Sequence, residues 1–305
     1  MPKRALLVVN RKSRNGSFDL RTVTERLKQS GMEVLPWALD RAEQVPEMIR
    51  RHAADVDFVV VGGGDGTLNA AAPALIETRL PLGVLPMGTA NDLARTLHIP
   101  VDIEQAADII IGSLMHKIDL GRVNGHYFFN AAHIGLGVHA HSHLSHDVKQ
   151  RWGIFGYARS LFKAITSFRP FRADIVCDGR RKRVRSIQIA VGNGRHYGGG
   201  MTIFEDASID DRLFFLYSIE PLGIWDLVKY APAFRAGRFE EHHPVDIEKG
   251  RSIRITTSRT MVVSADGEVV TRTPATFDMI AGAVKVFVPP AYLEHRKEEL
   301  HVAQR

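Results

Sequence analysis

The chain has 305 residues, of which 45% are hydrophobic and 24% charged, an ordinary composition for a soluble globular protein. Its apolar runs stay far short of the about 20 residues that a membrane-spanning helix needs, and residues 1–9 lead into a strand pattern without a signal-peptide segment. The single cysteine, Cys177, excludes an internal disulfide and fits a reducing compartment. We therefore expect a cytoplasmic protein of two domains, and the formal net charge of +6 favours anionic partners of any kind.

Strand and helix patterns alternate along the first 120 residues. Apolar, β-branched runs predict strands at Ala5–Val9, Glu33–Ala38, Phe58–Val61 and Leu82–Leu85. Apolar residues at helical spacing predict helices from Leu20 to a stop at Gly31, and at Val45–Ala53, Leu68–Thr78, Thr89–Leu97 and Asp102–Ile111. This alternation predicts a Rossmann-like α/β domain over residues 1–120, with a doubly wound parallel sheet.

Short extended runs and hairpin turns follow after residue 120. Asn124–Gly125, the strongest two-residue hairpin signal, joins the extended runs 117–123 and 126–131. Further turns of this type are expected at Asp178–Gly179, Asn193–Gly194 and Asp266–Gly267. The second domain, residues 121–289, is therefore expected to be all-β, an antiparallel β-sandwich. Helical insertions are expected near 152–168 and 223–236, and residues 290–305 are expected to form a C-terminal helical segment that packs on the first domain.

The strand pattern that begins at Phe58 leads into V-V-V-G-G-G-D-G-T-L-N, residues 59–69. Because glycine tolerates positive φ, the four glycines of this loop can turn their N–H groups toward an anion, next to the positive end of a helix that starts at Thr67. Asp65 would repel that anion unless a cation lay between them, which indicates a nucleotide bound with Mg²⁺. The alternative is a plain tight turn between strand and helix, which does not require three consecutive glycines.

The loop departs from the commonest nucleotide-binding patterns. It lacks both the G-x-x-x-x-G-K-[ST] pattern and the third glycine of the dinucleotide fingerprint, and the chain has no protein-kinase H-R-D or D-F-G set. The G-G-D-G-T string instead resembles the family of diacylglycerol kinases, sphingosine kinases and bacterial lipid kinases, and more remotely NAD kinases and phosphofructokinases. The block L-P-M-G-T-A-N-D-L-A-R at residues 85–95 and the late Asp266-Gly267-Glu268 strengthen the lipid-kinase branch. The resemblance then spans nearly the whole chain.

The resemblance implies an ATP- and Mg²⁺-dependent kinase that phosphorylates a hydroxyl of a diacylglycerol-like, sphingoid or phosphatidylglycerol-like lipid. Nucleotide binding then falls on Asn10, Ser13, Gly63, Gly64, Asp65, Gly66, Thr67, Leu68, Asn69, Gly88 and Thr89. Asp65 and Asp92 would share a water-mediated Mg²⁺ network and belong to the catalytic residues. Helix capping alone is the alternative for Thr89 and Asn91.

Glu268 is the residue that the resemblance assigns as the general base. A lipid hydroxyl is a poor nucleophile at neutral pH, and a carboxylate within hydrogen-bonding reach can take its proton as the γ-phosphoryl group leaves ATP. The base would then come from the second domain and the nucleotide from the first, so the resemblance implies an active site in the cleft between the domains. Taken alone, Asp266–Gly267 is only a hairpin turn, and Asp266 is the next candidate for the base.

The stretch at residues 198–213 resembles one that holds a structural Mg²⁺ in bacterial relatives. The resemblance implies the backbone carbonyls of Ser208 and Leu213 and the carboxylate of Asp211 as ligands. Arg212 stands where the family has glycine. The alternative is an acidic turn that pairs with nearby arginines.

Three further stretches are rich in histidine or positive charge. The histidines at 139, 141, 143 and 146 indicate an exposed edge rather than a transition-metal site. Arg180–Arg185 indicates a solvated hairpin, with phospholipid head groups or nucleic acid as the alternative contacts. Trp152–Arg172 is typical either of a core helix with a charged outer face or of a basic amphipathic surface for shallow membrane contact.

We expect a lipid substrate presented at a membrane surface, with transient peripheral membrane association, and a homodimer is compatible with the sequence. A kinase for a soluble substrate such as NAD is the second hypothesis, and a non-catalytic nucleotide- or nucleic-acid-binding module is the third. The N-D-L-A-R block and the D-G-E string favour the first hypothesis over the second. The sequence has no helix-turn-helix, RNP or zinc-knuckle pattern, so we expect no nucleic-acid partner.

Overall fold

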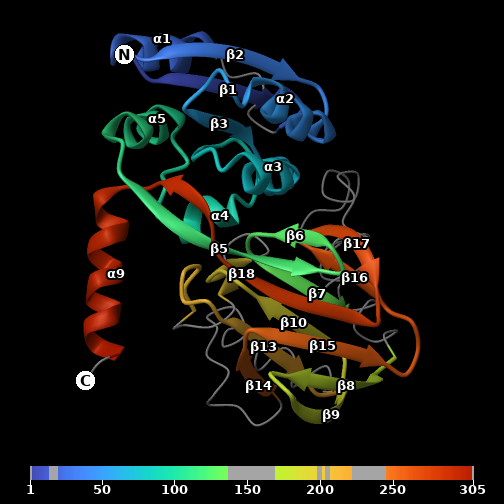
Figure 1. Ribbon diagram of the computed structural model, residues 1–305. Coiled ribbons are helices and arrows are strands. Elements are labelled where there is room, and N and C mark those ends of the chain that lie inside the picture. Colours follow the sequence, from blue (N-terminus) through green and yellow to red (C-terminus); the bar gives the residue numbers. More distant parts are fainter. Residues whose placement is uncertain are drawn as a thin grey trace, which may run out of the picture. The chain divides into compact units, whose positions relative to one another are not determined.

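The computed structural model describes residues 2–13, 20–136, 169–197, 201–202, 207–221 and 245–303 (Figure 1). The chain divides into two compact units. Unit 1 consists chiefly of residues 1–120 and 281–305, and unit 2 of residues 121–197 and 201–280. The chain passes from one unit to the other within strands β5 (Met115–Val123) and β18 (Ala275–Phe287).

Unit 1 is built on a parallel sheet. Its strands are β1 (Arg4–Asn10), β2 (Glu33–Leu39), β3 (Phe58–Gly63) and β4 (Leu82–Pro86), and they lie in the order β2-β1-β3-β4. Val286 of β18 pairs in parallel with Leu82, which extends the sheet beyond β4. Every residue of β3 and β4 is buried, as expected for a parallel sheet covered on both faces. The predicted α/β fold class of the first half is confirmed.

The helices of unit 1 follow the expected order along the chain. They are α1 (Leu20–Gln29), α2 (Val45–His52), α3 (Asp65–Thr78), α4 (Asp92–Thr96), α5 (Ile103–Gly112) and α9 (Pro290–Ala303), with a short 3₁₀ turn η1 at Ala42–Gln44. The Asp102 carboxylate accepts a hydrogen bond from the N–H of Gln105 at 2.9 Å, which confirms the predicted start of α5. Tyr292 of α9 packs edge-on against His98 and His116, with ring centroids 5.8 and 5.5 Å apart.

Two helices begin at residues other than those predicted. α3 begins at Asp65, so Asp65 and Gly66 lie in its first turn and not in a loop before it. α4 begins at Asp92 and not at Thr89, because Asn91 has a φ of 51°, a left-handed conformation that a right-handed helix cannot contain. Thr89 therefore belongs to the loop between β4 and α4.

Unit 2 is an antiparallel β-sandwich, as predicted. One sheet has the order β14-β13-β10-β7-β16-β17, and the other joins the first part of β18 to β15, β8 and β9. The bounds are β6 His126–Phe128, β7 Ala131–Gly135, β8 Phe171–Cys177, β9 Arg180–Ser186, β10 Gln188–Gly192, β13 Phe214–Ile219, β14 Val245–Gly250, β15 Ser252–Thr257, β16 Val262–Ala265 and β17 Glu268–Arg272, with a short pair β11 His196–Tyr197 and β12 Met201–Thr202. Buried residues from both sheets, among them Ile134, Val191, Ile175 and Ile253, form one core. Within the described ranges, no helix has the length and apolar character needed to cross a bilayer.

Three of the four predicted hairpin turns are confirmed. Asn124–Gly125, Asp178–Gly179 and Asp266–Gly267 connect paired strands, and both residues of each turn have positive φ, between 45° and 91°. The prediction for Asn193–Gly194 is wrong, because the preceding strand β10 pairs with β7 and with β13, which begins only at Phe214, and not with the residues directly after the turn. The N–H of buried Asn193 donates instead to the carbonyl of Asn130 at 2.8 Å. The predicted helical insertions at 152–168 and 223–236 and the histidines at 139–146 lie outside the described residues.

Candidate nucleotide-binding and catalytic site

The glycine-rich ends of β3 and β4 lie side by side in unit 1. Gly63 pairs with Pro86, and the N–H of Met87 donates to the carbonyl of Gly63 at 2.9 Å. A Cβ atom on Gly88 would lie only 2.5 Å from the Cα of Gly64, so the two loops touch backbone to backbone and both positions require glycine. Loops that follow the carboxyl ends of neighbouring parallel strands are where α/β sheets bind their ligands.

The glycines at the end of β3 are required by packing and not by backbone conformation. A Cβ atom on Gly63 would lie 2.4 Å from the Cβ of Thr67, and one on Gly62 would lie 2.8 Å from Cγ2 of Val9. Gly64 has a φ of −90°, and no glycine from 62 to 66 has a positive φ. The predicted nest of positive-φ glycines is therefore wrong. The N–H groups in the first turn of α3 remain as the candidate anion contacts.

The loop after β1 is tied to the start of α3. Asn10 donates from Nδ2 to the Oγ1 of Thr67 at 3.0 Å, and its Oδ1 accepts a hydrogen bond from the N–H of Lys12 at 3.0 Å. The N–H of Ser13 donates to the carbonyl of Asn10 at 3.1 Å, which closes a turn. The structure therefore brings together Asn10, Ser13 and Thr67, which the sequence assigns to nucleotide binding.

The remaining predicted nucleotide residues differ in what they present. Leu68 is buried in the core of unit 1, so only its backbone can contact a ligand. The Oδ1 of Asn69 is buried and has no hydrogen-bond partner among the residues that the structure describes. Thr89 is exposed in the loop before α4. The residues assigned to nucleotide binding therefore differ in role: some shape the loops, and others have a polar group that can contact a ligand.

Two carboxylates stand at the starts of α3 and α4. Asp92 is 5% exposed, and Asp65 is half-buried and accepts a hydrogen bond from the N–H of Leu93 at 3.2 Å. Burial and the negative charge of Asp92 raise the pKa of Asp65 above its ordinary value, although backbone N–H groups partly offset both effects. A bound cation would stabilise ionised Asp65 beside the second acid. The pair therefore fits the Mg²⁺ that the resemblance implies.

Asn91 shapes the loop between these two acids. Its Oδ1 accepts a hydrogen bond from the N–H of Gly88 at 2.8 Å, and its Nδ2 donates to the carbonyl of Gly88 at 3.1 Å. Asn91 occupies the N-cap position of α4, but its side chain makes no capping hydrogen bond. The capping alternative for Asn91 is therefore wrong, because its side chain is committed to the loop before the helix.

Sequence reasoning missed a buried carboxylate in unit 1. Asp119 of β5 is 2% exposed, and its Oδ1 accepts a hydrogen bond from the N–H of Gly282 at 2.6 Å. The sequence signal that could have indicated its burial is the position of Asp119 between the apolar residues Ile118 and Leu120, in a run with strand character. A buried acid of this kind needs donors around it, and here β18 supplies one.

The hairpin turn of β16 and β17 carries two carboxylates with different surroundings. Asp266 accepts hydrogen bonds from three successive backbone N–H groups, those of Phe129 at 2.7 Å, Asn130 at 3.0 Å and Ala131 at 3.1 Å. Its side chain therefore fixes the β6–β7 loop. Glu268, the first residue of β17, is exposed. Of the two carboxylates, Glu268 is the better placed to accept a proton from a ligand.

Asp211 lies in a tight turn beside both other residues of the metal prediction. Its Oδ2 accepts a hydrogen bond from the N–H of Ser208 at 3.1 Å, and its Oδ1 accepts one from the N–H of Leu213 at 2.8 Å. Arg212 has a φ of 64°, the left-handed conformation that glycine adopts most easily, so the turn keeps that shape without glycine. Asp211 is thus satisfied without an ion, and no group of three or more His, Cys, Asp or Glu side chains in the described part of the chain could hold a metal. The structural Mg²⁺ stays a prediction.

Comparison with known proteins identifies the family. The diacylglycerol kinase catalytic domain matches residues 4–123, and the YegS C-terminal NAD kinase beta sandwich-like domain matches residues 132–288. A diacylglycerol kinase of Staphylococcus aureus is 30% identical over 95% of this chain and 93% of its own, and one of Staphylococcus saprophyticus is 29% identical over 95% and 96%. A crystal structure of a diacylglycerol kinase from Bacillus anthracis superposes with a TM-score of 0.77 at 26% identity, covering 95% of this chain and 98% of that one. The chain therefore belongs to the diacylglycerol kinase family and is a kinase.

Proposed function

We propose that the protein is an ATP- and Mg²⁺-dependent lipid kinase, which transfers the γ-phosphoryl group of ATP to a hydroxyl of a diacylglycerol-like, sphingoid or phosphatidylglycerol-like lipid. The observation that carries this proposal is the pair Asp65 and Asp92, at the starts of two helices whose preceding loops touch at Gly64 and Gly88. A polyphosphate brings further negative charge to such a place, so it binds there together with a divalent cation.

The residues of unit 1 bind and orient the nucleotide. The first-turn N–H groups of α3 contact phosphate, while Asn10 and Thr67 hold the loop after β1 against that helix. Asn91 holds the second loop through its two hydrogen bonds to Gly88. Asp65 and Asp92 would hold Mg²⁺, and the ion would neutralise negative charge on the phosphates.

Glu268 acts as the general base in this proposal. It takes the proton of the acceptor hydroxyl as the hydroxyl oxygen forms a bond to the γ-phosphorus, while the bond from that phosphorus to the bridging oxygen breaks and ADP leaves. Two observations support the assignment: Glu268 is exposed, and the neighbouring Asp266 is committed to three backbone N–H groups. Asp266 is accordingly assigned a structural role.

A soluble acceptor such as NAD is the second candidate. It is favoured by one observation, that the family matching residues 132–288 is described as NAD kinase beta sandwich-like. The same loops and the same carboxylate pair would serve either acceptor, because both reactions transfer the γ-phosphoryl group to a hydroxyl.

Incubation with γ-labelled ATP, Mg²⁺ and either a total lipid extract or NAD separates the two candidates. We expect label in the organic-extractable fraction from the lipid reaction, and no label there with Asp65→Asn. Label in NADP alone would favour the soluble acceptor. Absence of label from both reactions, with protein shown to be folded, would contradict both candidates.

A further inference from the structure

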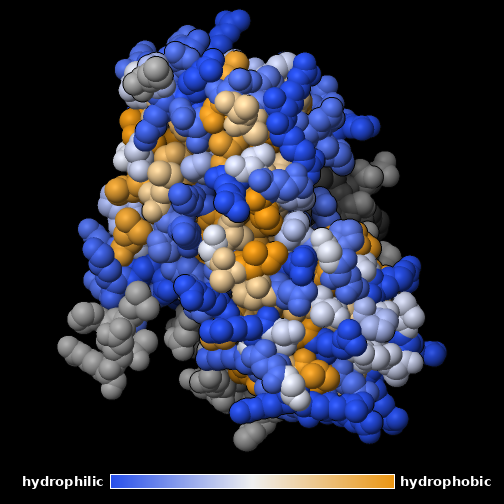
Figure 2. Space-filling view, in the orientation of Figure 1, coloured by the Kyte–Doolittle hydropathy of each residue, from blue (hydrophilic) through white to orange (hydrophobic). Residues whose placement is uncertain are grey.

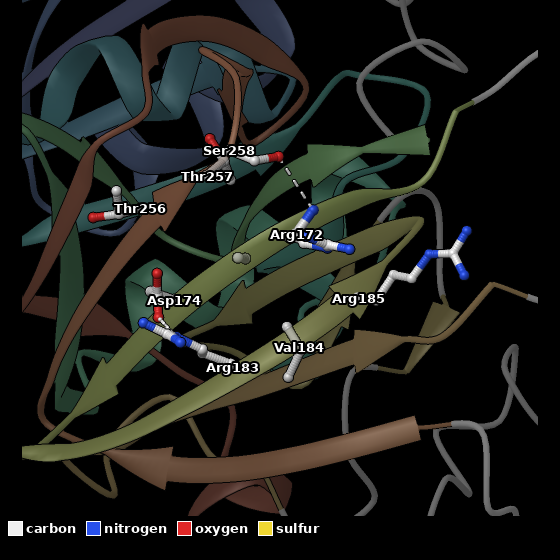
Figure 3. Close-up of a pocket in the computed structure, with 9 residues that line it drawn as sticks. Arg172, Asp174, Arg183, Val184, Arg185, Thr256, Thr257 and Ser258 are labelled. Atoms are coloured by element: carbon white, nitrogen blue, oxygen red, sulfur yellow. Dashed lines mark hydrogen bonds and ion pairs between the residues drawn. The ribbon is translucent and has the colours of Figure 1, made fainter.

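Unit 2 has a pocket on the sheet formed by β8, β9 and β15 (Figure 3). Its volume is about 590 Å³, and each strand region contributes three successive residues, 172–174, 183–185 and 256–258. The exposed Arg172 and Arg185 alternate along their strands with the buried Ala173 and Val184, so the pocket opens on the face that points away from the sandwich core. Figure 2 shows strongly hydrophilic residues over β9.

Two arginines in this pocket are not neutralised. Arg172 of β8 and Arg185 of β9 are direct cross-strand partners, and in the described part of the chain neither side chain makes an ion pair or a hydrogen bond. The acid of the pocket, Asp174, is already bound by Arg183 at 2.8 Å and by Arg181 at 3.2 Å, and the hydrogen bond from Arg183 is the main cause of its lowered pKa. Figure 3 shows Arg183 turned toward Asp174, with Arg172 and Arg185 beyond them. Two positive charges therefore remain uncompensated.

This placement of arginines does not serve the sheet. Like charges directly opposite one another on neighbouring strands are destabilising. Basic residues on an edge strand such as β9 do prevent pairing with other chains. That explanation fails for Arg172, because β8 lies between β15 and β9 and is not an edge. A local feature that works against the fold is expected where the residues bind something.

The polar groups of the pocket identify the chemistry of the ligand. The Oγ of Ser258 accepts a hydrogen bond from the N–H of Arg172 at 3.4 Å, so its O–H remains able to donate, and the hydroxyl of Thr256 lies on the same exposed face. A phosphomonoester carries about −1.5 to −2 charge at pH 7 and three acceptor oxygens, which matches two guanidinium groups and hydroxyl donors. A carboxylate or phosphodiester carries only one negative charge and would leave one of the two positive charges uncompensated.

We propose that this pocket binds the phosphomonoester head group of a membrane lipid, the class of product that the proposed lipid kinase releases. The phosphate chemistry follows from the pocket itself, and the choice of a lipid as its carrier rests on the proposed function. The pocket would hold the protein at membranes that already contain phosphorylated lipid, through Arg172 and Arg185.

Vesicle cosedimentation without ATP tests the proposal independently of catalysis. The vesicles contain phosphatidylcholine alone, or phosphatidylcholine with phosphatidate or with phosphatidylglycerol. We expect the unmutated protein to prefer phosphatidate, and Arg172→Gln/Arg185→Gln to bind it about 30-fold more weakly. Its thermal stability should be unchanged or higher, because the two like charges are removed. Replacement of both arginines by lysine keeps the charge but loses the planar fork, so we expect intermediate binding.

The matched control is Arg180→Gln/Arg251→Gln, which removes two exposed charges, one at the start of β9 and one directly before β15. An equal loss of phosphatidate binding with this control would show a general charge effect and would overturn the proposal. Unchanged phosphatidate binding by Arg172→Gln/Arg185→Gln would overturn it too. Stabilisation of the unmutated protein by inorganic phosphate in solution, without binding to phosphatidate vesicles, would overturn the lipid as carrier. If the protein phosphorylates no lipid but still prefers phosphatidate vesicles through Arg172 and Arg185, the proposed function is overturned and this proposal stands.

Discussion

Asp65 and Asp266 both precede a glycine, yet their carboxylates have different surroundings. Asp266 has three N–H donors from one loop and holds that loop in place. Asp65 lies beside a second acid, Asp92, and burial together with that charge raises its pKa. The same two-letter motif therefore serves stability in one unit and, in our proposal, chemistry in the other. The difference lies in the donors and charges around the carboxylate, not in the motif.

The largest effect on activity is expected from Glu268, two residues after Asp266. Glu268→Gln keeps the size of the side chain but removes the proton acceptor, so phosphoryl transfer should fall about 10²- to 10⁴-fold while ATP affinity stays the same. Steady-state kinetics and calorimetric titration with ATP check both parts. Glu220→Gln, at an exposed position after β13, is the matched control and should be fully active. Near-normal turnover by Glu268→Gln would show that Glu268 is not the general base and that Asp266–Gly267 is only a hairpin turn.

A smaller effect is expected where the two nucleotide loops touch. Gly88→Ala places a methyl group 2.5 Å from the Cα of Gly64 and so must displace one loop. Because a shift of about 1 Å can cost 10²-fold in rate, kcat/KM for ATP should fall by about that factor. Gly112→Ala is the control, since its new Cβ would meet no atom within 4 Å. Equal kinetics for the two variants would contradict the close approach.

Asp266→Asn should act on stability and not on chemistry. The amide keeps one acceptor oxygen for three donors, so at least one buried N–H loses its partner, at a cost of about 1 to 3 kcal/mol in the free energy of unfolding. Urea denaturation measures this loss. Asp55→Asn, at an exposed position in unit 1, should change stability by less than about 0.5 kcal/mol. A stable but inactive Asp266→Asn would instead make Asp266 a catalytic residue.

The smallest effect is expected at Asp211. Asp211→Ala removes the acceptor for the N–H groups of Ser208 and Leu213, which should lower stability by about 1 to 2 kcal/mol. Thermal unfolding of the variant and of the unmutated protein, with and without Mg²⁺, measures this loss. An equal loss with and without Mg²⁺ would show that these two N–H groups alone satisfy the carboxylate. A larger loss in Mg²⁺ than without it would establish the metal site that the resemblance implies.

Features that depend on neighbours in the sequence could be predicted. The strand and helix alternation of the first half, the cap of α5 at Asp102 and three two-residue turns all follow from local patterns, and the structure confirms them. The reason for the glycines could not be predicted, because the atoms that crowd Gly64 and Gly88 belong to loops 24 residues apart in the sequence. The donors to Asp266 likewise come from residues 129–131, which no local pattern connects to the turn.

The most direct test of the account is Mg²⁺-dependent ATP binding by Asp65→Asn, measured by calorimetry next to Asp266→Asn. Because ionised Asp65 is disfavoured by burial and by Asp92, the asparagine should leave stability without Mg²⁺ unchanged or higher. We predict that Asp65→Asn nevertheless loses the increase in ATP affinity that Mg²⁺ gives, whereas Asp266→Asn keeps it. Binding of Mg²⁺ and ATP by Asp65→Asn as tight as that of the unmutated protein would contradict the assignment of the Asp65 and Asp92 pair.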